Sequence, residues 1–268
     1  CLGTTLERAN WLVNRHAKRA ENGFSITPEI LAAIEAHFEA AGEGRPLAGK
    51  RVVVTAGPTH EPIDPVRYIA NRSSGKQGFA IAAAAAKAGA HVTLIAGPVN
   101  LPTPQGVIRV DVETARQMAA AVDAALPADV AIMVAAVADW RSADQSAQKI
   151  KKDGSGQVPP LQLVENPDIL ATISQHQTLR PKLVVGFAAE TTRLIEHARE
   201  KLTRKQCDLI VANDVGAGTG VMGGDSNTVH IVEAGQVVSW PKLGKDEVAQ
   251  RLVDLCASRI GGAPEGTK

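Results

Sequence analysis

From Lys50 onward, short runs of β-branched residues alternate with alanine-rich helical segments, and this alternation limits the possible folds more than any other feature of the chain. Strands that are separated by helices form βαβ units, in which the strands lie parallel in one sheet and the helices cover its faces. We therefore predict an α/β fold with a doubly wound, Rossmann-like parallel sheet. The segment TVHIVEAGQVVSW, with EAG at its centre, predicts an antiparallel hairpin at one edge of this sheet.

The apolar runs and the turn residues between them give the bounds of each expected element. Strands are expected at 51–55, 91–96, 107–112, 130–138, 182–189 and 207–212, and helices at 75–90, 115–126, 166–174, 191–205 and 245–260. The run of alanines within the first of these helices indicates that this helix packs closely on the sheet.

Residues 1–45 differ from the rest of the chain, because they contain two helical patterns followed by the Gly- and Pro-containing segment GEGRPLAG. We interpret them as a helical lead and linker, ahead of one domain at 46–262 and a disordered tail at 263–268. Since the chain begins with Cys1 rather than Met, we expect it to be a piece of a longer polypeptide. No signal peptide is visible at its start.

Charge and hydropathy exclude several classes of protein. Lys and Arg number 29 against 28 Asp and Glu, and a net charge of +1 is too balanced for a general nucleic-acid or anionic-membrane surface. No apolar run approaches the roughly 20 residues that would span a bilayer, so we expect no membrane segment. The cysteines are odd in number and lack C-x-x-C spacing, which favours a reducing cytoplasm.

Motifs for several common enzymes are also missing. The histidines are scattered without metal-ligand spacing, and G-x-S-x-G is absent, so zinc sites and hydrolase triads are disfavoured. The long segment AGPTHEPIDPVRYIANRSSGKQG follows the first strand, where G-x-G-x-x-G of a dinucleotide site would lie, and it does not match a P-loop either. Within it, Ser73, Ser74 and Gly75 open a helix and either bind an anion there or simply cap the helix.

Other polar residues follow the ends of strands, where ligands bind in doubly wound sheets. Asp139 could hold a metal ion or a ribose hydroxyl, or cap a turn. The KIKK segment at 149–152 could be a solvated loop or a lid of ammonium groups over phosphates. Lys201 and Lys205 lie four positions apart on one helix, so they either converge on one anion or form an ordinary exposed helix face.

Six motifs occur in a fixed order: TAGPTHEPIDPVRYIANRSSGKQG, AAVADWR, KIKK, ENPDIL, VVGFAAET and AND. Together they closely resemble the phosphopantothenate–cysteine ligase family, which forms the ligase half of a bacterial bifunctional coenzyme A biosynthesis protein. The resemblance covers residues 48–258. Residues 22–42 look like the segment that joins a flavin-dependent decarboxylase domain to this ligase, so we expect such a domain in the full-length protein and no flavin in this chain.

The resemblance implies an activity and its substrates. Members of the family use CTP and Mg²⁺ or a similar divalent cation to convert 4′-phosphopantothenate to an acyl-cytidylate with loss of pyrophosphate. The amine of L-cysteine then displaces CMP and gives 4′-phosphopantothenoylcysteine. Family members are homodimers in which the neighbouring subunit completes each site.

The resemblance also assigns roles to residues. Asn71 and Lys149 correspond to catalytic positions, Asp139 also to a metal position, and Arg67 with Ser73, Ser74 and Gly75 to substrate binding. The nucleotide-binding positions correspond to Met133, Val134, Ala135, Asp139, Lys149, Pro167, Asp168, Ile169, Leu170, Phe187, Lys201 and Lys205.

Two other functions compete with this one. A nicotinamide-dependent reductase or epimerase is opposed by the missing dinucleotide fingerprint and by the lack of a Y-x-x-x-K pair after the fourth strand. A nucleotide-sensing module without catalysis is compatible with the motifs, but it would have no use for Asn71 and Lys149.

Overall fold

The computed structural model describes residues 45–151, 160–190, 192–214, 224 and 226–261. The contacts divide the chain into Cys1–Arg45 and Pro46–Lys268, and every described helix and strand belongs to the second unit. The predicted helices of the lead, the predicted tail at 263–268 and Lys152 lie outside the described residues.

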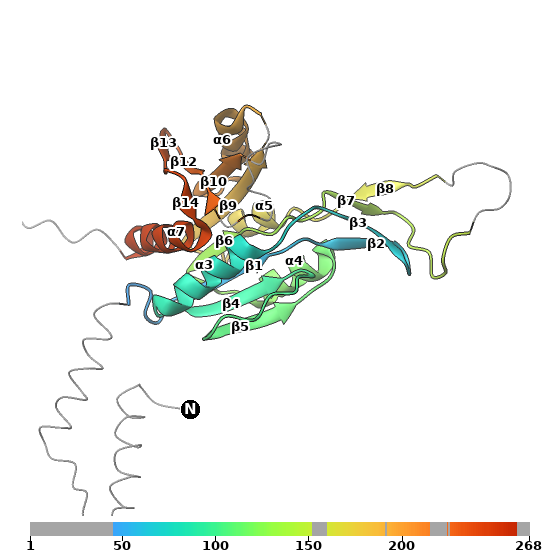
Figure 1. The fold of residues 1–268 in the computed structure, drawn as a ribbon, viewed down its shortest axis with the longest axis horizontal. Helices are drawn as coiled ribbons and strands as arrows, with labels where there is room; N and C mark the ends of the chain where they lie inside the picture. The colour runs from blue at the N-terminus through green and yellow to red at the C-terminus, as the bar shows by residue number, and fades with distance from the viewer. Residues whose placement is uncertain (1–44, 152–159, 191, 215–223, 225, 262–268) are drawn as a thin grey trace, which may run out of the picture. The chain divides into compact units, whose positions relative to one another are not determined.

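The centre of the fold is one large sheet with the strand order β13-β12-β10-β9-β6-β1-β4-β5 (Figure 1). The chain starts in the middle of the sheet, builds outward through β4 and β5, and returns to the other side of β1 to add β6, β9 and β10. This reversal between β1 and β6 makes the sheet doubly wound and confirms the predicted fold class. The parallel strands are β1 (Arg51–Ala56), β4 (His91–Ala96), β5 (Val107–Asp111), β6 (Val130–Met133), β9 (Leu183–Glu190) and β10 (Leu209–Asp214).

The predicted hairpin is present at the edge beside β10. Its strands, β12 (Val229–Glu233) and β13 (Gln236–Ser239), pair antiparallel with each other, and β12 also pairs antiparallel with β10. Gly235 has φ +80°, a left-handed conformation that glycine adopts without strain. The EAG sequence therefore lies at the turn, as predicted.

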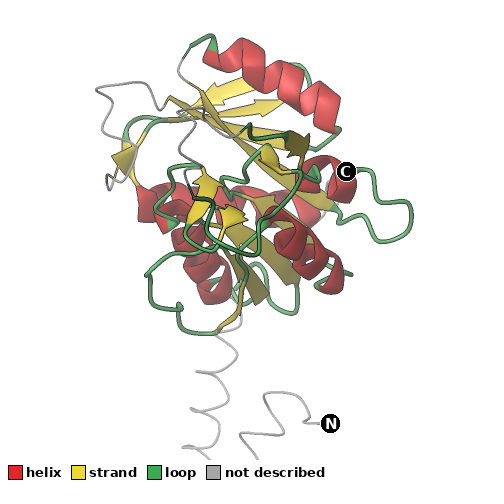
Figure 2. Ribbon diagram, turned by 90° about the vertical axis from the view of Figure 1, so that its right-hand side faces the viewer, coloured by secondary structure: helices red, strands yellow, loops and turns green. Residues whose placement is uncertain are grey.

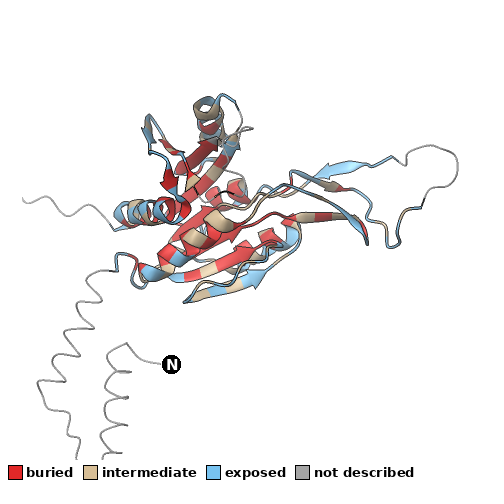
Figure 3. Ribbon diagram, viewed as in Figure 1, coloured by how far each residue is buried: buried red, intermediate tan, exposed pale blue. Residues whose placement is uncertain are grey.

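Helices cover both faces of the sheet (Figures 1 and 2). Because side chains alternate along a strand, Val52 and Val54 of β1 enter the core on one face and Val53 enters the core on the other. Figure 3 shows the buried residues concentrated in these central strands. The first face is covered by α3 (Lys76–Lys87) and α7 (Lys245–Ile260), and the second by α4 (Ala115–Ala124), α5 (Ile169–Ser174) and α6 (Leu194–Lys205).

Helix α3 packs closely on β1, as its alanine run predicted. A Cβ atom on Gly78 would lie 2.5 Å from the Cβ of Ala56, so only glycine fits at that position. Ala82 and Ala85 of the same helix are fully buried in the core on this face of the sheet. Small side chains therefore bring the amino end of α3 against the end of β1.

Two antiparallel arms project from the carboxyl end of the sheet (Figure 1), in segments that were expected to be loops. The predicted strand 130–138 also ends early, at Met133, because the next backbone N–H groups bond to a side chain of β1. One arm is formed by β2 (His60–Asp64) and β3 (Arg67–Ala70), and the other by β7 (Trp140–Ser142) and β8 (Leu163–Glu165). A separate small antiparallel pair is formed by β11 (Ser226–Asn227) and β14 (Leu243–Gly244).

Within the described part of the chain, every helix is too short or too polar to pass through a bilayer.

Candidate active site

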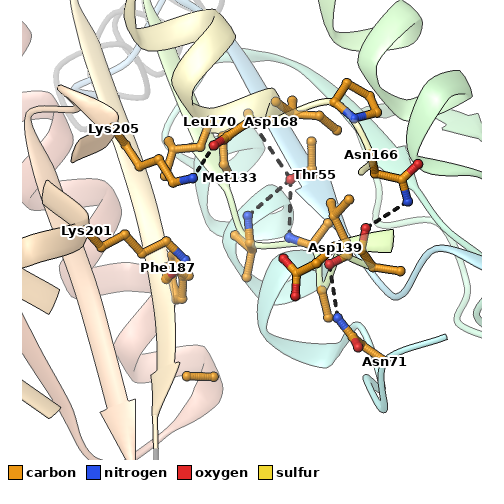
Figure 4. Close-up of a pocket in the computed structure, with 18 of the residues that line it drawn as sticks. Thr55, Asn71, Met133, Asp139, Asn166, Asp168, Leu170, Phe187, Lys201 and Lys205 are labelled. Carbon is orange, nitrogen blue, oxygen red and sulfur yellow. Dashed lines mark hydrogen bonds and ion pairs between the residues drawn. The ribbon is translucent and has the colours of Figure 1, made fainter. Parts of the chain in front are cut away.

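A cavity of about 630 Å³ opens at the carboxyl ends of β1, β6 and β9, at the point where the strand order reverses (Figure 4). It brings together every predicted nucleotide-binding residue except Lys149, and it includes Asn71. Its lining consists of Thr55, Asn71, Met133–Trp140, Glu165–Leu170, Phe187, Ala189, Lys201 and Lys205.

Thr55, which the sequence interpretation missed, shapes the inner wall of this cavity. Its hydroxyl oxygen accepts hydrogen bonds from the backbone N–H groups of Val134, at 3.1 Å, and Ala135, at 3.2 Å. The Thr55 side chain is buried, and the two donors, which line the cavity, are half-buried. The bonds turn the chain out of the sheet after Met133. A threonine at the end of an otherwise apolar strand was the only sequence signal.

Three further side chains hold the segment that follows. Asn71 donates from Nδ2 to the carbonyl oxygen of Val137 at 3.0 Å, and Asn166 donates to that of Ala138 at 2.8 Å. The hydroxyl of Thr59 accepts from the Ala138 N–H at 3.0 Å. Residues that flank β2, β3 and β8 thus fix the path of the chain up to the exposed Asp139. Neither Thr59 nor Asn166 was predicted as a site residue.

The opposite wall of the cavity is cationic (Figure 4). Lys205 forms an ion pair with Asp168, and the same carboxylate caps α5 by accepting from the Ala171 N–H at 3.0 Å. Lys201 donates to the carbonyl oxygen of Phe187 at 2.8 Å. The spacing of four positions on α6 therefore places both lysines at the same cavity.

The electrostatics of this wall favour an incoming anion. Burial lowers the pKa of Lys201, and the neighbouring charge of Lys205 lowers it further. For Asp168, burial raises the pKa, but hydrogen bonds from Lys205 and the Ala171 N–H outweigh that effect and leave it below its ordinary value. The carboxylates of Glu190 and Asp168 act on Lys201 in the opposite direction. A phosphate bound between the two ammonium groups would offset their mutual repulsion.

The residues around the cavity suit a metal ion that arrives with a polyphosphate. Among the described residues, no three His, Cys, Asp or Glu side chains converge to hold a metal ion. Mg²⁺ is often held by one or two carboxylates together with substrate phosphates and water. The exposed carboxylate of Asp139 at the cavity wall fits that arrangement.

A second pocket of about 140 Å³ adjoins the first and shares Val134 and Phe187 with it. The predicted substrate residues Ser73, Ser74 and Gly75 line this smaller pocket at the amino end of α3. No side chain caps this helix, since Gly75 holds the cap position with φ +73°. The serines therefore do not act as ordinary caps, and the end of the helix faces the pocket.

Two buried acceptors also belong to the second pocket. The Oε1 atom of Gln77 and the Oδ1 atom of Asn227 have no hydrogen-bond partner among the described residues, although Asn227 is only 4% exposed. A buried oxygen without a partner is costly, so a bound molecule with N–H or O–H groups would stabilise this pocket.

Arg67 and Lys149 lie outside both pockets. Arg67, in β3, bonds to Asp64 and to the carbonyl oxygen of Ile150. Lys149 is exposed in the segment that follows β7, and so is Lys151. The structure thus gathers most of the predicted residues at one place but keeps these two on the arms.

Comparison with known proteins finds a family model and curated relatives that match most of the chain. The family model "DNA/pantothenate metabolism flavoprotein C-terminal domain" matches residues 47–259. The chain is 47% identical over 232 residues to the coenzyme A biosynthesis bifunctional protein CoaBC of Escherichia coli, an alignment that covers 86% of this chain and 56% of that protein. The chain thus spans about half the length of the curated relatives it matches.

Solved structures show the same fold. The crystal structure of the C-terminal domain of a CoaBC protein matches with a TM-score of 0.68 and 37% identity, covering 81% of this chain and 98% of that one. A Cab2 mutant in complex with phosphopantothenate-cysteine matches with a TM-score of 0.64 over 86% of this chain and 95% of that one. At 17% identity, the second match shows the shared fold alone.

Proposed function

Because the chain belongs to the family of DNA/pantothenate metabolism flavoprotein C-terminal domains, we propose that it is the ligase part of a bifunctional coenzyme A biosynthesis protein. Its reaction joins 4′-phosphopantothenate to L-cysteine at the expense of CTP, giving 4′-phosphopantothenoylcysteine, CMP and pyrophosphate. The observation that carries this proposal is the cavity where the strand order reverses, with two ammonium groups of α6 in its wall.

The large cavity takes CTP. Its volume suits a nucleotide, and its position is the one at which doubly wound sheets bind ligands. Lys201 and Lys205 bind phosphate oxygens, and Lys205 exchanges its ion pair with Asp168 for the nucleotide. The backbone groups near Ala135 and Phe187 contact the base. Asp139 would hold Mg²⁺ together with the nucleotide, and the ion would supply further positive charge.

In the first half-reaction, the carboxylate of phosphopantothenate attacks the α-phosphorus of CTP, and the bond to pyrophosphate breaks. Two anions approach each other in this step, so the lysines of the cavity lower the barrier by offsetting the developing charge. In the second half-reaction, the amine of cysteine attacks the acyl carbon, loses a proton and displaces CMP. The neutral amide of Asn71 contacts the acyl-cytidylate without adding charge.

The second pocket takes the phosphopantothenate. Its phosphate binds at the amino end of α3, where the helix dipole and the hydroxyls of Ser73 and Ser74 favour an anion. The buried oxygens of Gln77 and Asn227 accept hydrogen bonds from the hydroxyl or amide groups of the substrate. The two pockets share a wall, which lets the carboxylate reach the nucleotide.

The working form is a homodimer. The arms expose large apolar side chains, among them Val66 at 59%, Tyr68 at 55% and Trp140 at 53%. Such a patch on a projecting arm is typical of an interface, and a second copy of the chain would cover it. In that dimer, Lys149 contributes its charge to the phosphates, and Arg67 contributes to the binding of the substrate.

A flavin-dependent decarboxylase domain precedes this part in the full-length protein, and the enzyme works in the cytoplasm. The two described cysteines fit that setting, because burial raises the pKa of Cys207 to about 11 and that of Cys256 to about 12. Thiols of this kind stay protonated and unreactive.

The test is whether pyrophosphate forms from CTP only when phosphopantothenate is present. We expect that pyrophosphate is released only when both molecules are present, and that the cysteine adduct forms when cysteine is added. Tight binding of CTP without any turnover would overturn the proposal in favour of a nucleotide sensor. Replacing Lys201 and Lys205 together with Gln is the control, since it should abolish release from this cavity.

A further inference from the structure

The tip of the β2–β3 arm holds the segment that carries Lys149. The backbone N–H of Ser146 donates to the carbonyl oxygen of Ile63 at 3.0 Å, and that of Ile150 donates to Oδ2 of Asp64 at 3.1 Å. These contacts join residues that are more than 80 positions apart in the sequence. The segment after β7 is therefore tied to the first arm at two points.

Asp64 is the centre of this contact, and its two carboxylate oxygens have separate partners. Oδ1 accepts from the N–H groups of Val66, at 2.9 Å, and Arg67, at 3.0 Å, which closes the turn between β2 and β3. Oδ2 accepts from the Arg67 guanidinium at 2.9 Å and from the Ile150 N–H. The side chain of Asp64 is fully buried, so its carboxylate depends on these hydrogen bonds.

Arg67 completes the grip on Ile150. Its Nη2 atom donates to the carbonyl oxygen of Ile150 at 2.7 Å, while its Nε atom bonds to Asp64. Both the N–H and the C=O of Ile150 are thus held by one ion pair. Lys149 is the residue immediately before Ile150, so the ion pair fixes the point from which the lysine side chain extends.

We propose that Asp64 and Arg67 are positioning residues for Lys149: by holding both backbone polar groups of Ile150, they determine where the lysine presents its charge. This inference rests on the proposed function, since that function gives Lys149 its phosphate. It gives Arg67 a second role, which acts through Lys149, in addition to its proposed contribution to substrate binding. A misplacement of about 1 Å is enough to lower turnover by about 10²-fold.

Asp64→Asn separates the two tasks of this carboxylate. The amide keeps Oδ1 for the turn of the arm, but its NH₂ group replaces the oxygen that accepts from Arg67 and Ile150. Asp129→Asn is the matched control. Asp129 likewise accepts a backbone N–H, from Arg51 at 3.0 Å, and pairs with Lys182 at 3.1 Å, but it lies at the amino end of the sheet.

Hydrogen exchange tests the positioning directly. In full-length chains without substrate, Asp64→Asn should speed the exchange of the Ile150 amide by about 10-fold or more, and Asp129→Asn should leave it unchanged. Circular dichroism and the oligomeric state show whether the variants remain folded. Unchanged exchange in folded Asp64→Asn would overturn the inference, whether or not the proposed function holds.

Kinetics test whether the positioning acts through Lys149. Asp64→Asn should lower kcat for pyrophosphate release by about 10-fold or more with KM for CTP changed by less than about 2-fold, and Asp129→Asn should change neither. In the Lys149→Gln background, Asp64→Asn should lower kcat by less than a further factor of about 2. Losses that multiply would overturn the inference. If the wild-type protein released no pyrophosphate, only the proposed function would be overturned. The hydrogen exchange of the Ile150 amide would still test whether Asp64 and Arg67 hold this segment.

Discussion

Replacing Thr55 with valine should loosen the wall of the large cavity without changing its volume. The hydroxyl that is lost accepts from the Val134 and Ala135 N–H groups and lies 3.9 Å from the sulfur of Met133. Val134 keeps a second acceptor, the carbonyl oxygen of Thr55 at 3.3 Å. Only Ala135 therefore loses its acceptor completely.

The expected loss of stability is that of one backbone N–H group, the one of Ala135, without an acceptor. A backbone N–H left without a partner in a shielded site costs about 1–3 kcal/mol. For a domain of this size, that free energy corresponds to a Tm lower by roughly 2–12 °C. Because the same N–H groups shape the wall that contacts the nucleotide, the Kd for CTP should rise by about 10-fold, which is about 1.4 kcal/mol.

Thr55→Ser is the matched control, because it keeps the acceptor and removes a buried methyl group. It should lose about 1 kcal/mol of stability and keep its affinity for CTP. Thermal unfolding and calorimetric titration with CTP measure both quantities. Wild-type CTP affinity in the valine variant, or weakened affinity in the serine variant, would refute the reasoning that the hydroxyl shapes this wall.

Four other outcomes are expected. Asn71→Asp should let acyl-cytidylate accumulate in quenched reactions, since a carboxylate repels the cytidylate phosphate; normal formation of the cysteine adduct would remove Asn71 from the mechanism. Lys201→Gln and Lys205→Gln should each raise KM for CTP by about 10-fold, and unchanged CTP kinetics in both would mean that the triphosphate binds elsewhere. Burial raises the pKa of Asp64, but hydrogen bonds outweigh that effect and lower the pKa from 3.8 to about 2. The ionised carboxylate therefore stabilises the folded state above about pH 4, and this contribution is lost as the pH falls toward 2. In urea unfolding, Asp64→Asn should lose less stability than the wild type over this pH range. A shortened protein that begins at Arg45 should keep its turnover, and insolubility or a much lower Tm would contradict the linker interpretation of 1–45.

The order and kind of the main helices and strands follow from local patterns in the sequence. A strand such as His91–Ala96 and a helix such as Lys76–Lys87 differ in the spacing of their apolar residues. This spacing depends only on neighbouring residues, so each element can be recognised from a short stretch of sequence. The resemblance of the ordered motifs to a ligase family also supplied residues that lie together in the large cavity. Their place agrees with the rule that ligand sites in doubly wound sheets lie where parallel strands end. The lysines of α6 met at one wall because their spacing of four matches the helix.

Contacts between residues that are distant in the sequence could not be predicted and became visible in the folded chain. The β2–β3 arm has no apolar alternation; it is held by the buried Asp64 and by the rings of His60 and Tyr68, which stack 4.0 Å apart. The hydrogen bond from Arg67 to the carbonyl oxygen of Ile150, 83 positions away, corresponds to no periodic pattern in the sequence. Thr55 likewise acquires its role only when β6 pairs beside β1. Contacts of this kind depend on strand order, which no local pattern encodes.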